Sequence, residues 1–198
     1  MLKTQTGFNL LEMVVVLAIT GLLSISAAPR ILDWSSALRV RLAAAEVAST
    51  FQRARIEAAR RRQNLGIRFE VQDSGEVSWT LYRDGDGDGI RSRDIEHGID
   101  PQVAPARRLR HLGRHVRFGL PESMKPTDPA DPRQSLRGLD DPIRFGSSNL
   151  ASFGPLGTAS PGTAYLTDGH QNLVAVRVLG ASARVKVIVY DPERERWR

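Results

Sequence analysis

The chain opens with an apolar block that carries no charged residue between residues 13 and 28. A short polar leader with Lys3 precedes this block, and Glu12 stands at its head. The stretch from Phe8 to Ala28 has about the length that a helix needs to cross a bilayer. Because Lys3 lies on the leader side, the positive-inside rule keeps the leader in the cytoplasm and places the rest of the chain beyond the membrane.

After the block, the pattern changes to two apolar stripes at helical spacing. Strong helix formers dominate residues 31–62, Pro29 is expected to kink rather than end the helix, and Asn64 with Gly66 supplies a stop. A helix that is apolar on two sides needs two partners. We expect the first stripe to pack on its own domain and the second to face neighbouring subunits; the alternative for the second is a deeper groove in the same domain. The first stripe is Val40, Ala44, Val47, Phe51, Ala54 and Ala58, and the second is Ile31, Trp34, Leu38, Leu42 and Ala45.

From residue 64 onward, short runs of alternating residues bounded by turn residues predict strands. The segment Pro121–Pro142 is rich in Pro, Asp, Ser and Gly, which predicts a long surface loop. The fold class is therefore α+β, with a long N-terminal helix packed on an antiparallel β domain. The expected strands are Leu65–Val71, Glu76–Tyr82, Val116–Phe118, Ile143–Phe145, Gly162–Leu166, Leu173–Leu179 and Arg184–Tyr190.

The order glycine, aromatic residue and glutamate at a fixed offset stands at Gly7, Phe8 and Glu12. It resembles the start of type IV prepilins and type II secretion prepseudopilins. The resemblance implies that a membrane prepilin peptidase cuts after Gly7 and methylates Phe8. It also implies that Glu12 neutralises the new amine, on this chain or on a neighbouring copy. Two alternatives are a secretory signal cut after residues 26–28 and a plain signal anchor.

Two further segments resemble the GspH/FimT group of pseudopilins. The stem motif of that group is matched by Arg55, Glu57 and Ala58, and its β domain by 153–157 followed by 162–166. The turn at 180–186 departs from the family's closing Gly-Arg-hydrophobic-Arg strand.

The resemblance implies a pilin-like organisation: leader 1–7, transmembrane and filament-core helix 8–29, stem 30–63 and β domain 64–198. The implied function is that of a minor pseudopilin in a type II secretion or type IV pilus filament. The partners would be other pseudopilins or pilins, the prepilin peptidase, the inner-membrane assembly platform, and secreted cargo or the outer-membrane channel. The location would be the bacterial inner membrane and then a periplasmic filament.

An acidic island with a net charge of −5 lies at residues 63–106 and contains the run from Asp84 to Ile90. Carboxylates at alternate positions around glycines can converge on one hard cation, as in the first half of an EF-hand loop. The expected ligands to Ca²⁺ are the side chains of Asp84, Asp86 and Asp88 and the carbonyl of Ile90, closed by Asp94 or by Glu96. The alternative is a solvated Asp-Gly hairpin neutralised by neighbouring arginines. A bound calcium would be structural, in a loop spanning 84–100.

The remaining chemistry indicates no enzyme. The chain has 198 residues and no cysteine, which excludes a disulfide framework and thiol catalysis, and its four histidines are scattered. The net charge of +6 leaves a second function class open, a minor pilin of a competence pilus that captures DNA. Its contacts would be Arg194 and Arg196, with Trp197 stacking on a base; the alternative is a nearly neutral, solvated tail.

Overall fold

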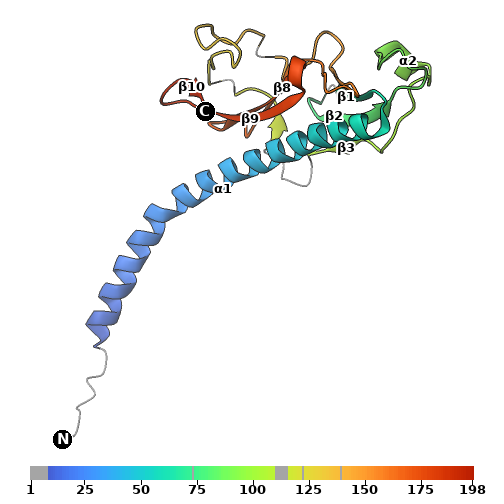
Figure 1. The fold of residues 1–198 in the computed structure, drawn as a ribbon. Helices are drawn as coiled ribbons and strands as arrows, with labels where there is room; N and C mark the ends of the chain where they lie inside the picture. Colours follow the sequence, from blue (N-terminus) through green and yellow to red (C-terminus); the bar gives the residue numbers. More distant parts are fainter. Residues whose placement is uncertain (1–8, 73, 110–115, 122, 139) are drawn as a thin grey trace, which may run out of the picture. The chain divides into compact units, whose positions relative to one another are not determined.

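A computed structural model describes residues 9–72, 74–109, 116–121, 123–138 and 140–198 of the chain, with the backbone alone for 26–32 (Figure 1). The chain divides into two compact units, residues 1–37 and 38–198. One helix, α1 (Leu10–Arg61), contributes to both. Because its 52 residues run past Pro29, the expectation that the helix continues beyond this proline is confirmed.

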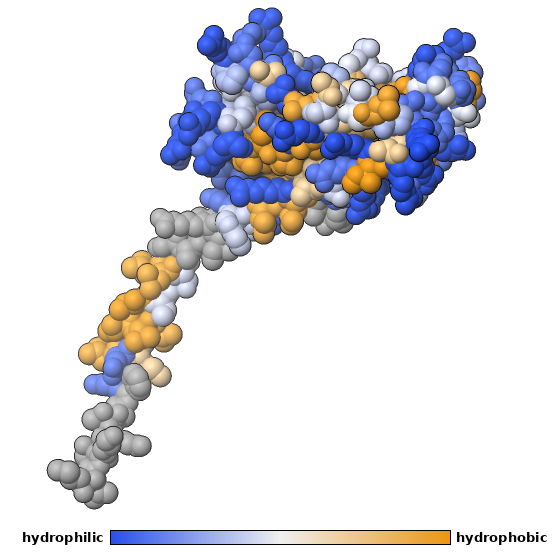
Figure 2. Space-filling model, in the orientation of Figure 1, coloured by the Kyte–Doolittle hydropathy of each residue, from blue (hydrophilic) through white to orange (hydrophobic). Residues whose placement is uncertain are grey.

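In the first unit, α1 is capped at its start and carries exposed apolar side chains from Leu10 to Ile25. The Asn9 side-chain oxygen accepts a hydrogen bond from the Leu11 amide at 3.3 Å, and Glu12 lies in the first turn. Both features favour a helix N-terminus, where amides are unpaired and the helix dipole is positive. The side chains that follow are apolar and exposed, with Leu10 at 82% and Leu17 at 70% (Figure 2).

In the second unit, the two predicted stripes of α1 have different surroundings. Every residue of the first stripe is buried, which confirms that this stripe packs on its own domain. Leu38, Leu42 and Ala45 of the second stripe are exposed. The alternative of a deeper groove in the same domain is therefore wrong for these three residues. Trp34, in the first unit, is 70% exposed, and the side chain of Ile31 lies outside the described residues.

The described residues of the β domain form two antiparallel sheets. The four-stranded sheet has the order β3-β2-β1-β6, and the other has the order β10-β9-β8-β7-β4, with β5 also paired to β7. The strands are β1 (Leu65–Val71), β2 (Val77–Arg83), β3 (Arg107–Arg108), β4 (Arg117–Phe118), β5 (Ile143–Arg144), β6 (Leu150–Phe153), β7 (Gly162–Thr167), β8 (Leu173–Leu179), β9 (Arg184–Asp191) and β10 (Arg196–Trp197).

These strands agree closely with the sequence prediction where the alternation is long. The bounds of β1 and β8 were predicted without error, and β2 is shifted by one residue. The short strands β6 and β10 and the helix α2 (Ser92–Glu96) were not predicted, because two to five residues carry too little periodicity.

Both sheets and α1 share one hydrophobic core. Phe51 of α1 lies at its centre, with ring centroids 5.9 Å from Phe69, 5.5 Å from Phe145 and 6.0 Å from Phe153. Around it, the buried face of α1 is built largely from small residues, which lets the helix approach the strands closely. These small residues are Ala43, Ala44, Ala48, Ala54 and Ala58.

The segment 121–142 is more than the surface loop that its composition predicts. Leu136 is buried in a second cluster with Tyr165, Leu173 and Tyr190, so the segment supplies apolar side chains to the packing around β7, β8 and β9. Its backbone is fixed as well, since the Pro129 carbonyl accepts a hydrogen bond from Arg177 at 2.8 Å.

Candidate functional site

The acidic loop at residues 84–100, named here the Asp-Gly loop, leaves the end of β2 and returns beside it. The Arg83 amide donates to the Pro101 carbonyl at 3.1 Å, and the Val103 amide donates to the Leu81 carbonyl at 2.8 Å. These two hydrogen bonds close the base of the loop. The loop is therefore a local excursion from the four-stranded sheet, and its geometry is set by its own contacts.

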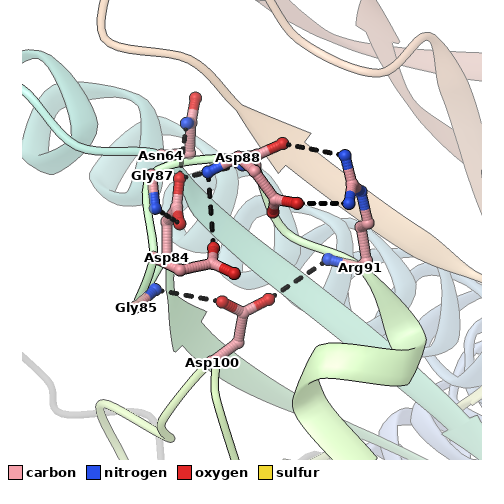
Figure 3. A network of polar contacts seen from close by, with 9 residues as sticks. Asn64, Asp84, Gly85, Gly87, Asp88, Arg91 and Asp100 are labelled. Atoms are coloured by element: carbon pink, nitrogen blue, oxygen red, sulfur yellow. Dashed lines mark hydrogen bonds and ion pairs between the residues drawn. The ribbon is translucent and has the colours of Figure 1, made fainter.

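Asp84 organises the first half of the loop. Its carboxylate accepts hydrogen bonds from Asn64 Nδ2 at 2.7 Å, the Gly87 amide at 2.7 Å and the Gly89 amide at 3.0 Å (Figure 3). Burial of Asp84 raises its pKa, but these donors outweigh burial and leave the pKa below its usual value. Asp84 is thus held as a buried carboxylate anion. Asn64, predicted only as a helix stop, is one of its partners.

The glycines of this run are required by the backbone. A Cβ at residue 85 would lie 1.8 Å from the Ile99 carbonyl oxygen, and Gly87 and Gly89 have φ of +91° and +100°. Only glycine adopts such φ values without strain. Beyond them, the Ile90 side chain is buried against β1, where a Cβ on Gly66 would come within 2.7 Å of it. The loop is therefore packed onto the sheet.

Asp86 and Asp88 lie at the exposed side of the loop. Asp88 forms an ion pair with the Arg91 guanidinium, and its amide donates to Asp86 Oδ1 at 3.3 Å (Figure 3). Burial raises the pKa of Asp88; Arg91 lowers it, and the negative charges of Asp86 and Asp94 add to the rise, so that the net shift is upward. Arg91 therefore pairs with one acid of the cluster.

The second half of the loop contains three more acids, Asp94, Glu96 and Asp100, and each has different surroundings. Asp94 is buried, and its Oδ2 has no hydrogen-bond partner among the residues that the structure describes. Glu96 is exposed and forms an ion pair with Arg68 of β1 at 3.0 Å. Asp100 is buried and accepts hydrogen bonds from the amides of Gly85 at 3.0 Å and Arg91 at 3.2 Å. Sequence analysis missed Asp100 because it lies outside the alternating run of aspartates, at the end of the loop, where the chain returns to β2.

The three residues assigned to DNA contact in the alternative function differ in how accessible they are to a ligand. Arg194 and Arg196 are exposed, as a phosphate contact would require. Trp197 instead belongs to β10, where its indole N–H donates to the Thr127 carbonyl at 2.7 Å and its ring lies 5.1 Å from that of Tyr190. A base could stack on Trp197 only after the ring left this packing. Residues 192–196 are exposed, as the alternative of a solvated tail expects, and Arg196 and Trp197 form the short strand β10.

The N-terminal features are described in part. Gly7 and Phe8 lie outside the described residues, while Glu12 is exposed on the first turn of α1. Within the part of the chain that the structure describes, no helix offers an apolar stretch of the length that a membrane crossing requires.

A shallow groove of about 270 Å³ lies between α1 and β9. Gln52, Arg55 and Ile56 line it from the helix, and Arg184 and Val185 line it from the strand. Arg55 belongs to the stem motif noted in the sequence, so this motif reaches the surface beside a second arginine. A neighbouring acidic group would be attracted to such a site.

Together, the exposed apolar helix of the first unit and the helix-covered β domain of the second define an α+β subunit. Residues 43–189 match the family described as type II transport protein GspH. The chain belongs to this family, whose members are structural pseudopilin components of type II secretion. The comparison with curated proteins and the comparison with solved structures each gave no match.

Proposed function

We propose that this chain is a minor pseudopilin that is cut after Gly7 and assembled into a periplasmic filament through its N-terminal helix. The observation that carries the proposal is the exposed apolar surface of α1 in the first unit, with Leu10, Leu17 and Leu22 each at least 69% exposed. Apolar area of this extent is stable only when lipid or another protein covers it. The family match supports the same role.

Before assembly, the segment 8–29 would be held in the inner membrane, with the leader in the cytoplasm and the β domain in the periplasm. This part of the proposal rests on the sequence, in which no charge interrupts residues 13–28 and Lys3 precedes them. Prepilin peptidase would remove residues 1–7, so that Phe8 carries a free and then methylated amine.

In the filament, Glu12 would pair with the N-terminal amine of a neighbouring subunit. A carboxylate and an ammonium that enter an apolar bundle unpaired are each costly, so the pair fixes the axial position of one helix against the next. The exposed residues Leu38, Leu42 and Ala45 would extend the contact along the stem. The β domain would then face cargo, the assembly platform or the secretion channel.

The test is the N-terminal mass of the full chain produced with and without a prepilin peptidase. With the peptidase we expect loss of residues 1–7 and a methylated Phe8, and without it an intact N-terminus. Gly7→Val should block the cut, because a larger side chain occupies the position before the scissile bond. Glu12→Gln should be cut normally but fail to enter filaments, which separates processing from assembly. An intact N-terminus in the presence of an active peptidase would contradict the proposal.

A further inference from the structure

The Asp-Gly loop brings three carboxylates to one point. Ligand oxygens of Asp84, Asp86 and Asp88 lie within 4.8 Å of one another. Oxygens on opposite sides of a Ca²⁺ ion are about 4.6–5.2 Å apart, because each Ca–O distance is about 2.3–2.6 Å. One ion could therefore contact all three acids without a rearrangement of the loop. An acidic cluster alone is not a site, and the case depends on a second observation.

That observation is the Asp94 carboxylate. Asp94 is 8% exposed, and its buried Oδ2 has no hydrogen-bond partner among the described residues. The Asp94 amide donates to the Arg91 carbonyl at 3.1 Å, which holds Asp94 in the first turn of α2. Its carboxylate is near enough to Asp88 for its charge to act on that group. A buried carboxylate oxygen without a partner is costly, so it points to a missing partner that is positively charged.

The other acids of the loop have their own partners. Glu96, the second candidate for closing the site, is directed to Arg68 at 3.0 Å. Asp100 uses both oxygens on backbone amides, so it positions the loop. Asp84 accepts three hydrogen bonds, and the Asp86 amide acts on it as well. One of its carboxylate oxygens still lies within 4.8 Å of ligand oxygens of Asp86 and Asp88.

Charge favours the same conclusion. The Asp-Gly loop contains six acidic and two basic residues, a formal net charge of −4. Arg91 pairs with Asp88 and Arg68 pairs with Glu96, whereas Asp84, Asp86 and Asp94 form no ion pair that the described residues provide. Oxygen donors alone select a hard cation, and a loop with a backbone carbonyl among its ligands suits Ca²⁺ better than Mg²⁺, which keeps most of its water.

We propose that the Asp-Gly loop binds one Ca²⁺ ion through the side chains of Asp84, Asp86, Asp88 and Asp94 and the carbonyl of Ile90. The proposed function does not require this site. A processed subunit without calcium affinity would leave that function intact, and a calcium-binding subunit with an uncut leader would leave the calcium site intact. The ion would fix the loop and α2 on the sheet, where they form part of the exposed surface of the β domain.

The experiment is calorimetric titration of the detergent-solubilised full chain with CaCl₂, paired with trypsin digestion. We expect one site with a dissociation constant of about 10⁻⁵–10⁻³ M, a range that runs from the weakest sensor sites to extracellular modules. Trypsin cleaves after Arg91 and Arg93, both exposed in the loop, and Ca²⁺ should slow these two cuts at least about tenfold. NaCl at equal ionic strength is the control for screening.

Two matched variants identify the closing ligand. Asp94→Ala should weaken Ca²⁺ binding at least about tenfold, whereas Glu96→Ala, two residues away, should change it less than about twofold. In EDTA, Asp94→Ala should melt at or above the wild-type temperature, because it removes an unpaired buried oxygen. A merely structural Asp94 would instead lower the melting temperature in EDTA.

Three results would overturn the proposal. The first is the absence of binding heat and of trypsin protection up to about 10 mM CaCl₂, ten times the weakest expected constant. The second is equal protection by NaCl at matched ionic strength. The third is loss of binding in Glu96→Ala with retention in Asp94→Ala, which would assign a different ligand set.

Discussion

Phe51 of α1 meets Phe69 of β1 edge to face, with ring centroids 5.9 Å apart and an interplanar angle of 74°. Phe51 is fully buried, and two more phenylalanines surround it. Edge-to-face pairs add about 0.5–1.5 kcal/mol to the burial of each ring. This one side chain therefore joins the helix to the β domain.

Phe51→Ala should lower the free energy of unfolding of the solubilised chain by about 3–5 kcal/mol, through lost burial and the cavity that remains. The measurement is urea unfolding followed by circular dichroism. Ile56→Ala, on the exposed side of the same helix, should change the free energy by less than about 0.5 kcal/mol. Similar effects of the two substitutions would show that the helix does not depend on the buried stripe.

Tyr165 makes the stability of the β domain dependent on pH at the alkaline end. Burial raises the pKa of Tyr165 from 10 to about 12. The folded state holds the Tyr165 hydroxyl proton more tightly than the unfolded state does. The contribution of Tyr165 to the free energy of unfolding is therefore complete below pH 10 and is lost as pH rises to about 12. A shift of this size corresponds to at most about 3 kcal/mol.

We expect Tyr165→Phe to flatten the fall in stability between pH 10 and pH 12. Urea midpoints at intervals across this range would measure it. Tyr190, whose pKa is also raised, would leave a smaller slope of the same sign in the variant. An unchanged slope in Tyr165→Phe would show that other groups dominate.

The exposed stem residue Leu42 should contact a neighbouring subunit after assembly, because it is 49% exposed on a helix whose other side is buried. A photo-crosslinking benzoylphenylalanine at residue 42 should give covalent adducts with another pseudopilin in cells that contain the secretion system. The same residue at position 125, on the β domain, is the positional control. The Gly7→Val background should abolish the adducts at residue 42, and equal yields with and without cleavage would argue against a filament contact.

Much of this fold could be predicted from the order of apolar residues. The buried stripe of α1 and the strands β1 and β8 follow from periodicities that persist over at least seven residues. The division into two sheets could not be predicted, because β6 pairs with β1 across a long separation in sequence and the alternation of its four residues is too short to reveal this.

The Asp-Gly loop shows the same limit at the level of single residues. The alternating aspartates identified Asp84, Asp86 and Asp88, but not which acid follows them. The choice between Asp94 and Glu96 depends on the burial of Asp94 and on the ion pair between Glu96 and Arg68. This ion pair joins residues that are 28 positions apart in the sequence. The sequence does not reveal that Asp100 positions the loop, because its hydrogen bond with the Gly85 amide forms only where the chain returns to the sheet.

The alanines on the buried face of α1 set the distance between the helix and the strands. Enlarging one of them, for example Ala54, would leave the apolar pattern intact yet force the helix outward, because interiors are close-packed. The exposed side chains of the same turns would move with it. Substitutions on the buried face of the stem should therefore be tolerated only if they leave the exposed face in its place. The small residues of the core thus help to set the position of the surface that takes part in assembly.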